Sequence, residues 1–244
     1  LADALARSIS GKKVFTSPKQ DMDWLNKNLS LITAEACHGE LKKAWESNDR
    51  QIFIGGNIEL KKADSRIQKA YLSSKSKGVN PLKKEGKAEF AYKNFGKPGQ
   101  IVERKEDEAL GVVQLRFSNN VRLNLKRTDY EKDSISIGAR IGSGMLSMPK
   151  DKPGLATVAS AIFTAGGLKQ HSTDELRRIF AGKTVSGSFA VDEDAFIYSG
   201  STNRKDLVNA LQLMTAYIVE PGYREEALRQ FQNQLGPLYT QLAH

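Results

Sequence analysis

Residues 141–167 constrain the fold of this chain more than any other stretch. Small residues at 142–144 end a predicted strand, and a polar loop leads from them into a short apolar helix predicted from Pro153 to about Thr164. Proline suits the first turn of a helix, and Gly166-Gly167 suits its end. The segment therefore predicts a strand, a tight turn and a helix whose small side chains can pack closely against a sheet.

The sequence on either side of this segment predicts a mixture of strands and helices. Apolar residues alternate with polar ones at 113–117 and again at 121–125, and the turn residues between them predict a hairpin. Ser172 and Glu175 have the spacing of a capping box that opens a helix. The complete prediction is a hairpin at 112–125, a strand at 134–141, helices at 153–164 and from 172, a hairpin at 185–200, and helices at 204–217 and 224–244. This order indicates an α+β fold.

Residues 1–58 predict a different pattern, with three helices followed by one strand. The helices are expected at 2–9, 19–29 and about 33–45, the last capped by Thr33, and the strand at 51–55.

The positive charge of the chain is concentrated in one segment. The formal net charge is +9, and residues 61–105 contain thirteen basic and four acidic residues, which accounts for all of it. Charged, glycine- and proline-containing sequence of this kind is typical of a solvated linker, and 73–88 is its most linker-like part. The alternative is a polyanion-binding strip, in which Phe90, Tyr92 and Phe95 interleave with lysines. No nucleic-acid-binding motif accompanies them, so nucleic acid is not the expected partner.

Other residue types exclude several classes of protein. Cys37 is the only cysteine, so the chain forms no internal disulfide and no cysteine-based zinc site. No apolar run approaches the roughly 20 residues of a membrane-spanning helix. Gly142-Ser143-Gly144 lacks the third glycine of a dinucleotide-binding loop. The chain begins without a methionine or a signal-peptide pattern, which suggests a fragment whose compartment the sequence leaves unknown.

Residues 141–167 closely resemble the active-site segment of the pitrilysin/insulinase family of zinc peptidases. In that family Gly-Leu-Ala, here Gly154 to Ala156, opens a helix that carries H-x-x-E-H. Two histidines four residues apart bind zinc on one helical face, and the glutamate between them activates a water molecule. The matching positions here hold Thr157, Ser160 and Ala161, which can do neither.

The third zinc ligand of the family is also missing. The resemblance implies that a glutamate would lie within about 231–241, yet the sequence contains no Asp or Glu after Glu226. The opening strands, with the Phe-Ser-Asn-Asn-Val turn, and the order of elements over 112–244 resemble the same family.

The resemblance implies a two-layer α+β sandwich of a mostly antiparallel sheet with helices on one face. It further implies three regions: 1–72 as the tail of a preceding peptidase-like domain, 73–111 as a basic linker between two halves, and 112–244 as an inactive peptidase-like domain. The expected function is the non-catalytic half of a zinc metalloendopeptidase, which forms the wall of a closed peptide-binding chamber opposite the catalytic half. The alternative is a scaffold or chaperone-like subunit of a wholly non-catalytic homologue.

We therefore expect no catalytic, cofactor-binding or metal-binding residue in this chain, with zinc held in the catalytic domain of the parent protein. The three histidines, His38, His171 and His244, are expected to be structural or surface residues. Phe189, Phe196 and Tyr198 are expected in the core, or alternatively in a substrate-facing wall. The expected partners are the catalytic half of the same polypeptide and a peptide substrate, without a membrane. By resemblance alone, the protein would be periplasmic or secreted.

Overall fold

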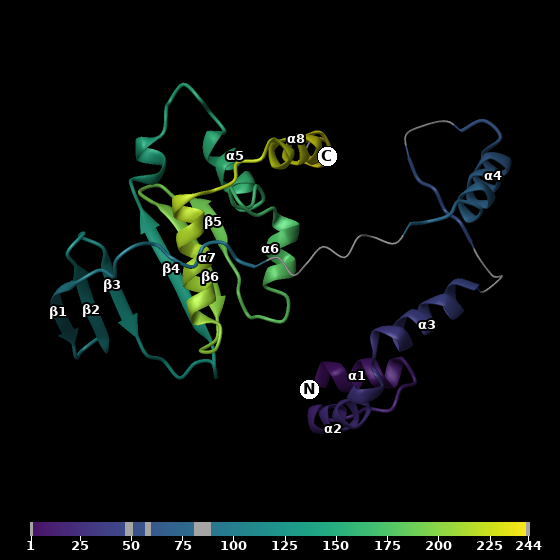
Figure 1. Ribbon diagram of the computed structural model, residues 1–244, viewed down its shortest axis with the longest axis horizontal. Helices are drawn as coiled ribbons and strands as arrows, with labels where there is room; N and C mark the ends of the chain where they lie inside the picture. Colours follow the sequence, from purple (N-terminus) through teal and green to yellow (C-terminus); the bar gives the residue numbers. More distant parts are fainter. Residues whose placement is uncertain (1, 47–50, 57–59, 81–88, 243–244) are drawn as a thin grey trace. The chain divides into compact units, whose positions relative to one another are not determined.

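The computed structural model describes residues 2–46, 51–56, 60–80 and 89–242 (Figure 1). It divides into two compact units, residues 1–80 and 81–244, which we call the N-terminal and the C-terminal unit. Among the described residues, no helix is long and apolar enough to cross a membrane.

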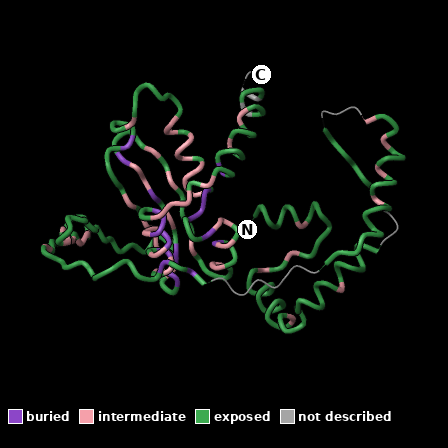
Figure 2. The backbone as a smooth tube through the Cα atoms, turned by 45° about the horizontal axis from the view of Figure 1, so that its top comes forward, coloured by how far each residue is buried: buried purple, intermediate pink, exposed green. Residues whose placement is uncertain are grey.

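The N-terminal unit is helical, as predicted. Its elements are α1 (Ala2–Ser10), α2 (Pro18–Asn28), a 3-10 turn η1 (Leu29–Leu31), α3 (Ala34–Glu46) and α4 (Ala63–Lys75). Thr33 caps α3 as expected, because its hydroxyl oxygen accepts a hydrogen bond of 3.1 Å from the backbone N–H of Ala36. None of the described residues of these helices is buried, and Figure 2 shows them as exposed or intermediate.

Two predictions for this unit are wrong. Residues 51–56 form no strand; Ile52 and Ile54 instead line an apolar pocket of about 510 Å³ together with residues of α4. Helix α4 occupies 63–75, within the basic stretch 61–105 for which the sequence predicts the character of a solvated linker. Ile52 and Ile54 nevertheless remain exposed, although Ile67 and Tyr71 of α4 line the same pocket.

The C-terminal unit has the α+β fold that the sequence predicts. Its strands are β1 (Ile101–Asp107), β2 (Val112–Phe117), β3 (Arg122–Lys126), β4 (Ile135–Ile141), β5 (Ser188–Val191) and β6 (Phe196–Thr202). Its helices are the 3-10 turn η2 (Gly144–Ser147), α5 (Leu155–Ile162), α6 (Thr173–Ile179), α7 (Leu207–Val219) and α8 (Glu225–Leu242). All strand pairs are antiparallel, and they form two sheets of three strands, in the orders β1-β2-β3 and β4-β6-β5.

Strand β1 lies inside the region 73–111 that the sequence predicts as linker. It pairs with β2, and the Glu103 carboxylate lies 2.8 Å from the Arg116 guanidinium on the neighbouring strand. The charged residues of β1 hide its strand character in the sequence, because alternation is visible only when one face is apolar. The ordered part of the C-terminal unit therefore begins well before residue 112.

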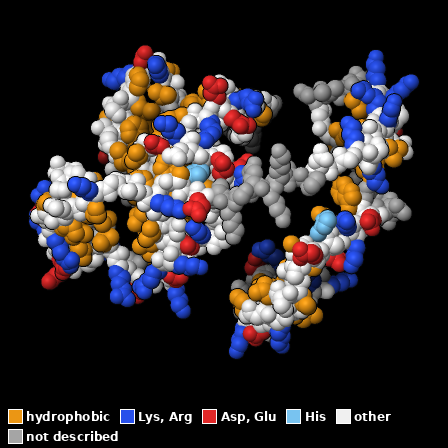
Figure 3. Space-filling view, viewed as in Figure 1, with side chains coloured by type: hydrophobic (Ala, Val, Ile, Leu, Met, Phe, Trp, Pro, Cys, Tyr) orange, Lys and Arg blue, Asp and Glu red, His pale blue; other side chains and the backbone are white. Residues whose placement is uncertain are grey.

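The sheet β1-β2-β3 has one apolar face. Val113 pairs with Leu125 and Leu115 with Leu123, so these four side chains share a face. Leu123 and Leu125 are exposed, and Figure 3 shows hydrophobic side chains gathered over this sheet.

The core of the C-terminal unit lies where β6, α7 and the loop before α6 meet. Leu168 is 0% exposed, and it clusters with Tyr198 of β6 and with Ala216 and Tyr217 of α7. The capping box predicted at the start of α6 is present: the Ser172 hydroxyl accepts from the N–H of Glu175, whose carboxylate accepts from the N–H of Ser172.

Alkaline pH should destabilise this core. Burial raises the pKa of Tyr217 to about 12, so the folded state favours the neutral phenol. The resulting stability is complete below the ordinary tyrosine pKa of about 10 and is lost as pH rises from 10 to 12. We expect urea unfolding to show a free energy that falls by up to about 1 kcal/mol per pH unit for this tyrosine in that window. The free energy of unfolding of Tyr217→Phe should fall less steeply with pH. Equal dependence on pH in the two proteins would contradict the assignment of the effect to Tyr217.

Candidate functional site

Helix α5 lies at one edge of the sheet β4-β6-β5 and carries the positions that match the zinc motif. It packs against β5 and against α8, and Figure 1 shows it beside the β5 edge. Thr157 and Ala161 are exposed and, being four residues apart, share one face of the helix. Ser160 is half-buried and turned toward β5. The structure thus brings the three positions together on one helix, as the sequence predicts.

Ser160 has a structural contact that the sequence does not reveal. Its hydroxyl oxygen accepts a hydrogen bond of 3.1 Å from the backbone N–H of Val191, the last residue of β5. Val191 is on an edge strand, and this N–H points away from β6. An unpaired backbone donor at a sheet edge is costly when water is excluded, so Ser160 both satisfies it and fastens α5 to the strand.

The remaining edge of β5 is open. Backbone groups alternate in direction along a strand, so the N–H and C=O of Phe189, two residues before Val191, also point away from β6. No strand of the described residues pairs with β5 on that side. Phe189 can therefore form main-chain hydrogen bonds to an added extended segment.

An apolar pocket of about 330 Å³ lies between α5 and the sheet. It is lined by Leu155, Val158, Ala159, Ile162, Phe163, Phe189, Phe196 and Tyr223. The rings of Phe163 and Phe189 are stacked with centroids 4.0 Å apart, and the ring of Tyr223 lies edge-on to Phe163 at 6.0 Å. Phe189 and Phe196 are thus only half-buried and line a pocket, whereas Tyr198 alone of the predicted aromatic group is fully in the core.

Hydrogen bonds to backbone carbonyl oxygens connect the loop that follows α5 to the segment just before α8. The guanidinium of Arg224 donates to the carbonyl oxygens of Gly166 and Leu168, both at 2.7 Å. The N–H of Gly222 donates to the carbonyl of Gly167 at 2.8 Å. These charge-assisted hydrogen bonds link the loop after α5 to the residue that precedes α8.

The carboxylates of α8 are confined to its first turn, at Glu225 and Glu226. The sequence from 227 onward has no Asp or Glu, and the half-buried positions of this part of the helix include Phe231 and Leu235. Within the described ranges, no three His, Cys, Asp or Glu residues are grouped so that they could hold a metal ion. The side chains around α5 can therefore offer apolar contact and hydrogen bonds, and none of the matching positions can hold or move a proton at pH 7.

His171 is buried in the loop before α6. Its Nε2 accepts a hydrogen bond of 2.9 Å from the N–H of Ala91, and Phe90 stacks on its ring at 5.7 Å. His38 is exposed on α3 beside Cys37, and His244 lies outside the described residues. His171 therefore has a structural role, in holding the segment around Ala91 on the C-terminal unit.

The same contacts overturn the interpretation of 89–95 as a row of nucleic-acid-stacking aromatics. Phe90 and Tyr92 are 7% and 8% exposed and belong to the core cluster. The Tyr92 hydroxyl contacts the Glu220 carboxylate at 3.1 Å and accepts from the N–H of Gln170. Phe95 alone of the three is exposed, and one ring does not make a stacking platform.

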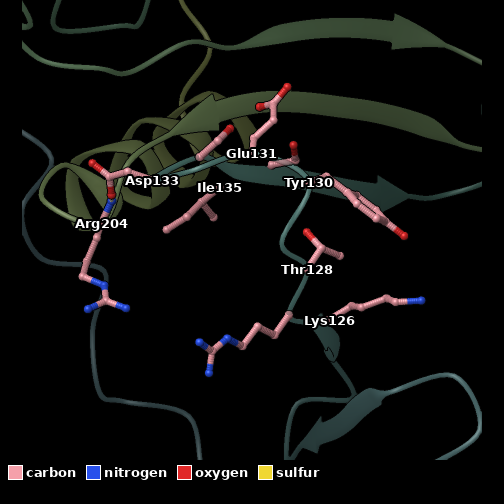
Figure 4. Close-up of a pocket in the computed structure, with 10 residues that line it drawn as sticks. Lys126, Thr128, Tyr130, Glu131, Asp133, Ile135 and Arg204 are labelled. Atoms are coloured by element: carbon pink, nitrogen blue, oxygen red, sulfur yellow. The ribbon is translucent and has the colours of Figure 1, made fainter.

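A larger pocket of about 840 Å³ lies along the connection between β3 and β4. Its charged residues have both signs, and the side chains of Lys126, Glu131 and Arg204 point in different directions around it (Figure 4). Binding sites for small molecules have a few polar groups that converge on one point. The α5–β5 pocket is therefore the better candidate for function.

Comparison with known proteins identifies the fold. No protein-family model matches the sequence, and no curated protein shows significant similarity to it. The structure is similar to the periplasmic protease PqqL from Escherichia coli, with 18% identity and a TM-score of 0.55, over 95% of this chain and 26% of that chain. A mutant of the ferredoxin protease FusC, solved with Arabidopsis ferredoxin, matches with 19% identity and a TM-score of 0.49, over 91% of this chain and 25% of that chain.

The match to PqqL shows the class of fold. The chain spans about a quarter of the length of the two structures, and its α+β architecture is similar to that of the corresponding part of PqqL. The fold class inferred from residues 141–167 is thereby confirmed, with the strands divided between two sheets.

Proposed function

We propose that this chain is a non-catalytic, peptidase-like module that binds an extended peptide along the edge of β5. The main observation behind this proposal is that α5 carries a structural hydrogen bond at the position where the family has its catalytic glutamate. Ser160 occupies that position, and its hydroxyl oxygen accepts from the N–H of Val191. The open backbone groups of Phe189 and the apolar pocket beside them support peptide binding at the same place.

The catalytic partner would be another part of the same polypeptide. In this proposal the H-x-x-E-H helix and its zinc belong to a catalytic half, and this chain forms the opposing wall of the chamber that encloses the substrate. The similarity to proteases four times its length supports this arrangement. The periplasm of a bacterium is the proposed location, because PqqL is periplasmic.

The purified chain should bind no stoichiometric zinc at α5 and cleave no peptide by itself. Thr157, Ser160 and Ala161 supply no imidazole or carboxylate, whereas catalytic zinc needs three protein ligands. Metal analysis after dialysis, together with cleavage of an unfolded protein substrate, checks this. Zinc bound at α5, lost on Thr157→Ala, would contradict the proposal.

Rebuilding the site gives a matched control. Thr157→His, Ser160→Glu and Ala161→His together restore two zinc ligands and the general base. We expect this variant to bind zinc at least about tenfold more weakly than one that also carries Phe231→Glu on α8, which adds a third ligand. Equal zinc affinity in the two variants would mean that α8 does not face the rebuilt site.

Binding of a peptide to the unmodified chain tests the proposed role directly. A peptide that binds as an added strand must lose affinity when the backbone N–H that faces β5 is methylated, because a main-chain hydrogen bond is removed. If cleavage appeared when a catalytic half was added to the chain, the two-halved arrangement would gain support. Peptide binding without any restored cleavage would favour a scaffold.

A further inference from the structure

The sheet β1-β2-β3 has a polar face opposite its apolar one. Residues that pair directly across neighbouring strands share a face of the sheet, and residues two positions apart on one strand do so as well. Two adjacent rows of side chains therefore point the same way. The first row is Glu103, Arg116 and Arg122, and the second is Lys105, Gln114 and Asn124. We call these six residues the polar face.

The polar face surrounds a shallow pocket of about 320 Å³, and Leu115 completes the lining. Three of the six residues are basic and one is acidic, so three positive charges less one negative charge leave an excess of two positive charges. Excess charge of one sign on a surface attracts partners of the opposite sign. The pocket is therefore suited to an anionic ligand.

The polar face already holds one carboxylate of its own. The Lys105 Nζ lies 2.8 Å from one carboxylate oxygen of Glu103, and the Arg116 Nε donates to the other oxygen at 2.8 Å. Hydrogen bonds from Lys105 and, second, from Arg116 lower the pKa of Glu103 to about 2. Both contacts favour the ionised form of this group, so a carboxylate is a chemistry that the surface stabilises.

Arg122 is the basic residue of the polar face that has no partner. It lies directly opposite Arg116 on the neighbouring strand, where like charges destabilise a sheet. Among the described residues, the Arg122 side chain makes no ion pair or hydrogen bond. Arg116 uses Nε for Glu103, so the terminal nitrogens of both guanidinium groups can donate to a further acceptor. An anion bound between the two arginines would remove their repulsion.

The second row of the polar face favours a peptide over a small anion. Gln114 and Asn124 are exposed and lie opposite each other, and each side-chain amide offers donors together with an acceptor. A phosphate dianion offers mainly acceptors. An acidic peptide carries a carboxylate for the arginines and backbone N–H and C=O groups for the amides. A peptide can therefore satisfy both rows at once.

From this arrangement we propose that the polar face binds an acidic segment of a partner protein, with one carboxylate of the partner held between Arg116 and Arg122. Planar guanidinium groups suit such a carboxylate because they can form paired hydrogen bonds to it. The polar face and the edge of β5 belong to different sheets. The inference therefore goes beyond the proposed function and does not depend on it.

The test uses the full 244-residue chain and a labelled nine-residue peptide of alternating glutamate and serine. Alternate residues of an extended chain point the same way, so the glutamates can face the sheet together. A matched peptide has glutamine in place of glutamate. We expect fluorescence polarisation at low salt to show at least about tenfold tighter binding of the glutamate peptide. This difference should shrink at high salt, because ions screen exposed charges.

Arg122→Gln and Arg104→Gln form a matched pair of variants. Each removes one positive charge from the same sheet, but Arg104 pairs with Leu115 and so lies on the opposite, apolar face. Arg122→Gln should bind the glutamate peptide about three- to tenfold more weakly, because a charge-assisted hydrogen bond is lost. Arg104→Gln should bind it within about twofold of the unmodified chain. Circular dichroism checks that both variants are folded.

Several results would overturn the proposal. Equal binding of the glutamate and glutamine peptides would show that carboxylates are not recognised. Equal losses in the two variants would show that only the net charge of the chain matters. Inorganic phosphate should displace the glutamate peptide no better than chloride at the same ionic strength. If phosphate alone displaced it, the polar face would be a phosphate site and the assignment of an acidic segment would be wrong. Failure of strand addition at β5 would change none of these outcomes.

Discussion

Gly144→Ala should destabilise the C-terminal unit by about 2–5 kcal/mol. Gly144 is buried with φ +53°, and a Cβ atom there would lie 2.3 Å from the carbonyl oxygen of Asp192 and 2.4 Å from the nitrogen of Ala195. Both are backbone atoms of the β5–β6 hairpin, so no side-chain rotation relieves the clash. The hairpin would have to move away from η2, which breaks the bond from the Met145 N–H to the Asp192 carbonyl.

Gly111→Ala is the matched control for this prediction. Gly111 has φ +62°, yet nothing lies within 4 Å of the position of a Cβ atom. The control retains the backbone strain of a left-handed alanine, about 1–2 kcal/mol, without the clash. Urea unfolding followed by near-ultraviolet circular dichroism of the tyrosines checks both variants. Equal losses would show that the approach of η2 to the hairpin is not close.

Leu168→Ala should cost about 2–5 kcal/mol of unfolding free energy. Leu168 is 0% exposed and lies in the cluster that joins the loop before α6 to β6 and α7. Removing its side chain leaves a cavity beside aromatic rings that are themselves held by other contacts, so collapse around it is limited. The backbone carbonyl that Arg224 binds is unaffected, which confines the change to packing.

The control for this second prediction is Leu146→Ala, at a position that is 79% exposed. We expect its unfolding free energy to change by less than about 0.5 kcal/mol. Both variants carry the same substitution in the same unit, so the difference between their losses of unfolding free energy measures the effect of burying the leucine side chain. Similar midpoints for the two variants in urea would indicate that Leu168 is not in the core.

The residue at position 160 also affects how α5 is held. Serine is short enough for its hydroxyl oxygen to accept a hydrogen bond directly from the backbone N–H of Val191. This hydrogen bond couples the helix to the strand edge, which gives position 160 a structural role.

Much of the secondary structure was predictable because its determinants are local. The capping box of Ser172 and Glu175 and the cap at Thr33 depend on residues three positions apart. The turn at 118–120, where Asn120 has φ +65°, lies between two alternating runs. The absence of zinc ligands at Thr157, Ser160 and Ala161 is a property of residue type, so it could also be identified in the sequence.

Other features depended on contacts between residues far apart in the chain. Strand β1 has no apolar alternation of its own and is a strand because β2 supplies its hydrogen-bonding partners. Phe90 and Tyr92 lie in a lysine-rich segment whose composition predicts that it is exposed to solvent. Contacts with His171 and Glu220, about 80 and 130 residues later in the chain, nevertheless hold this segment in the core.

The sequence by itself determined the α+β class, the order of the elements from residue 112 onward and the chemistry missing from α5. Propensity, capping and residue type act within a few positions, so they can be read along the chain. Only the tertiary structure decided that Ser160 satisfies Val191, that Phe189 keeps an open edge, and that a pocket forms beside it. Those features require α5 and β5, some thirty residues apart, to pack together, and packing depends on shape across the whole unit.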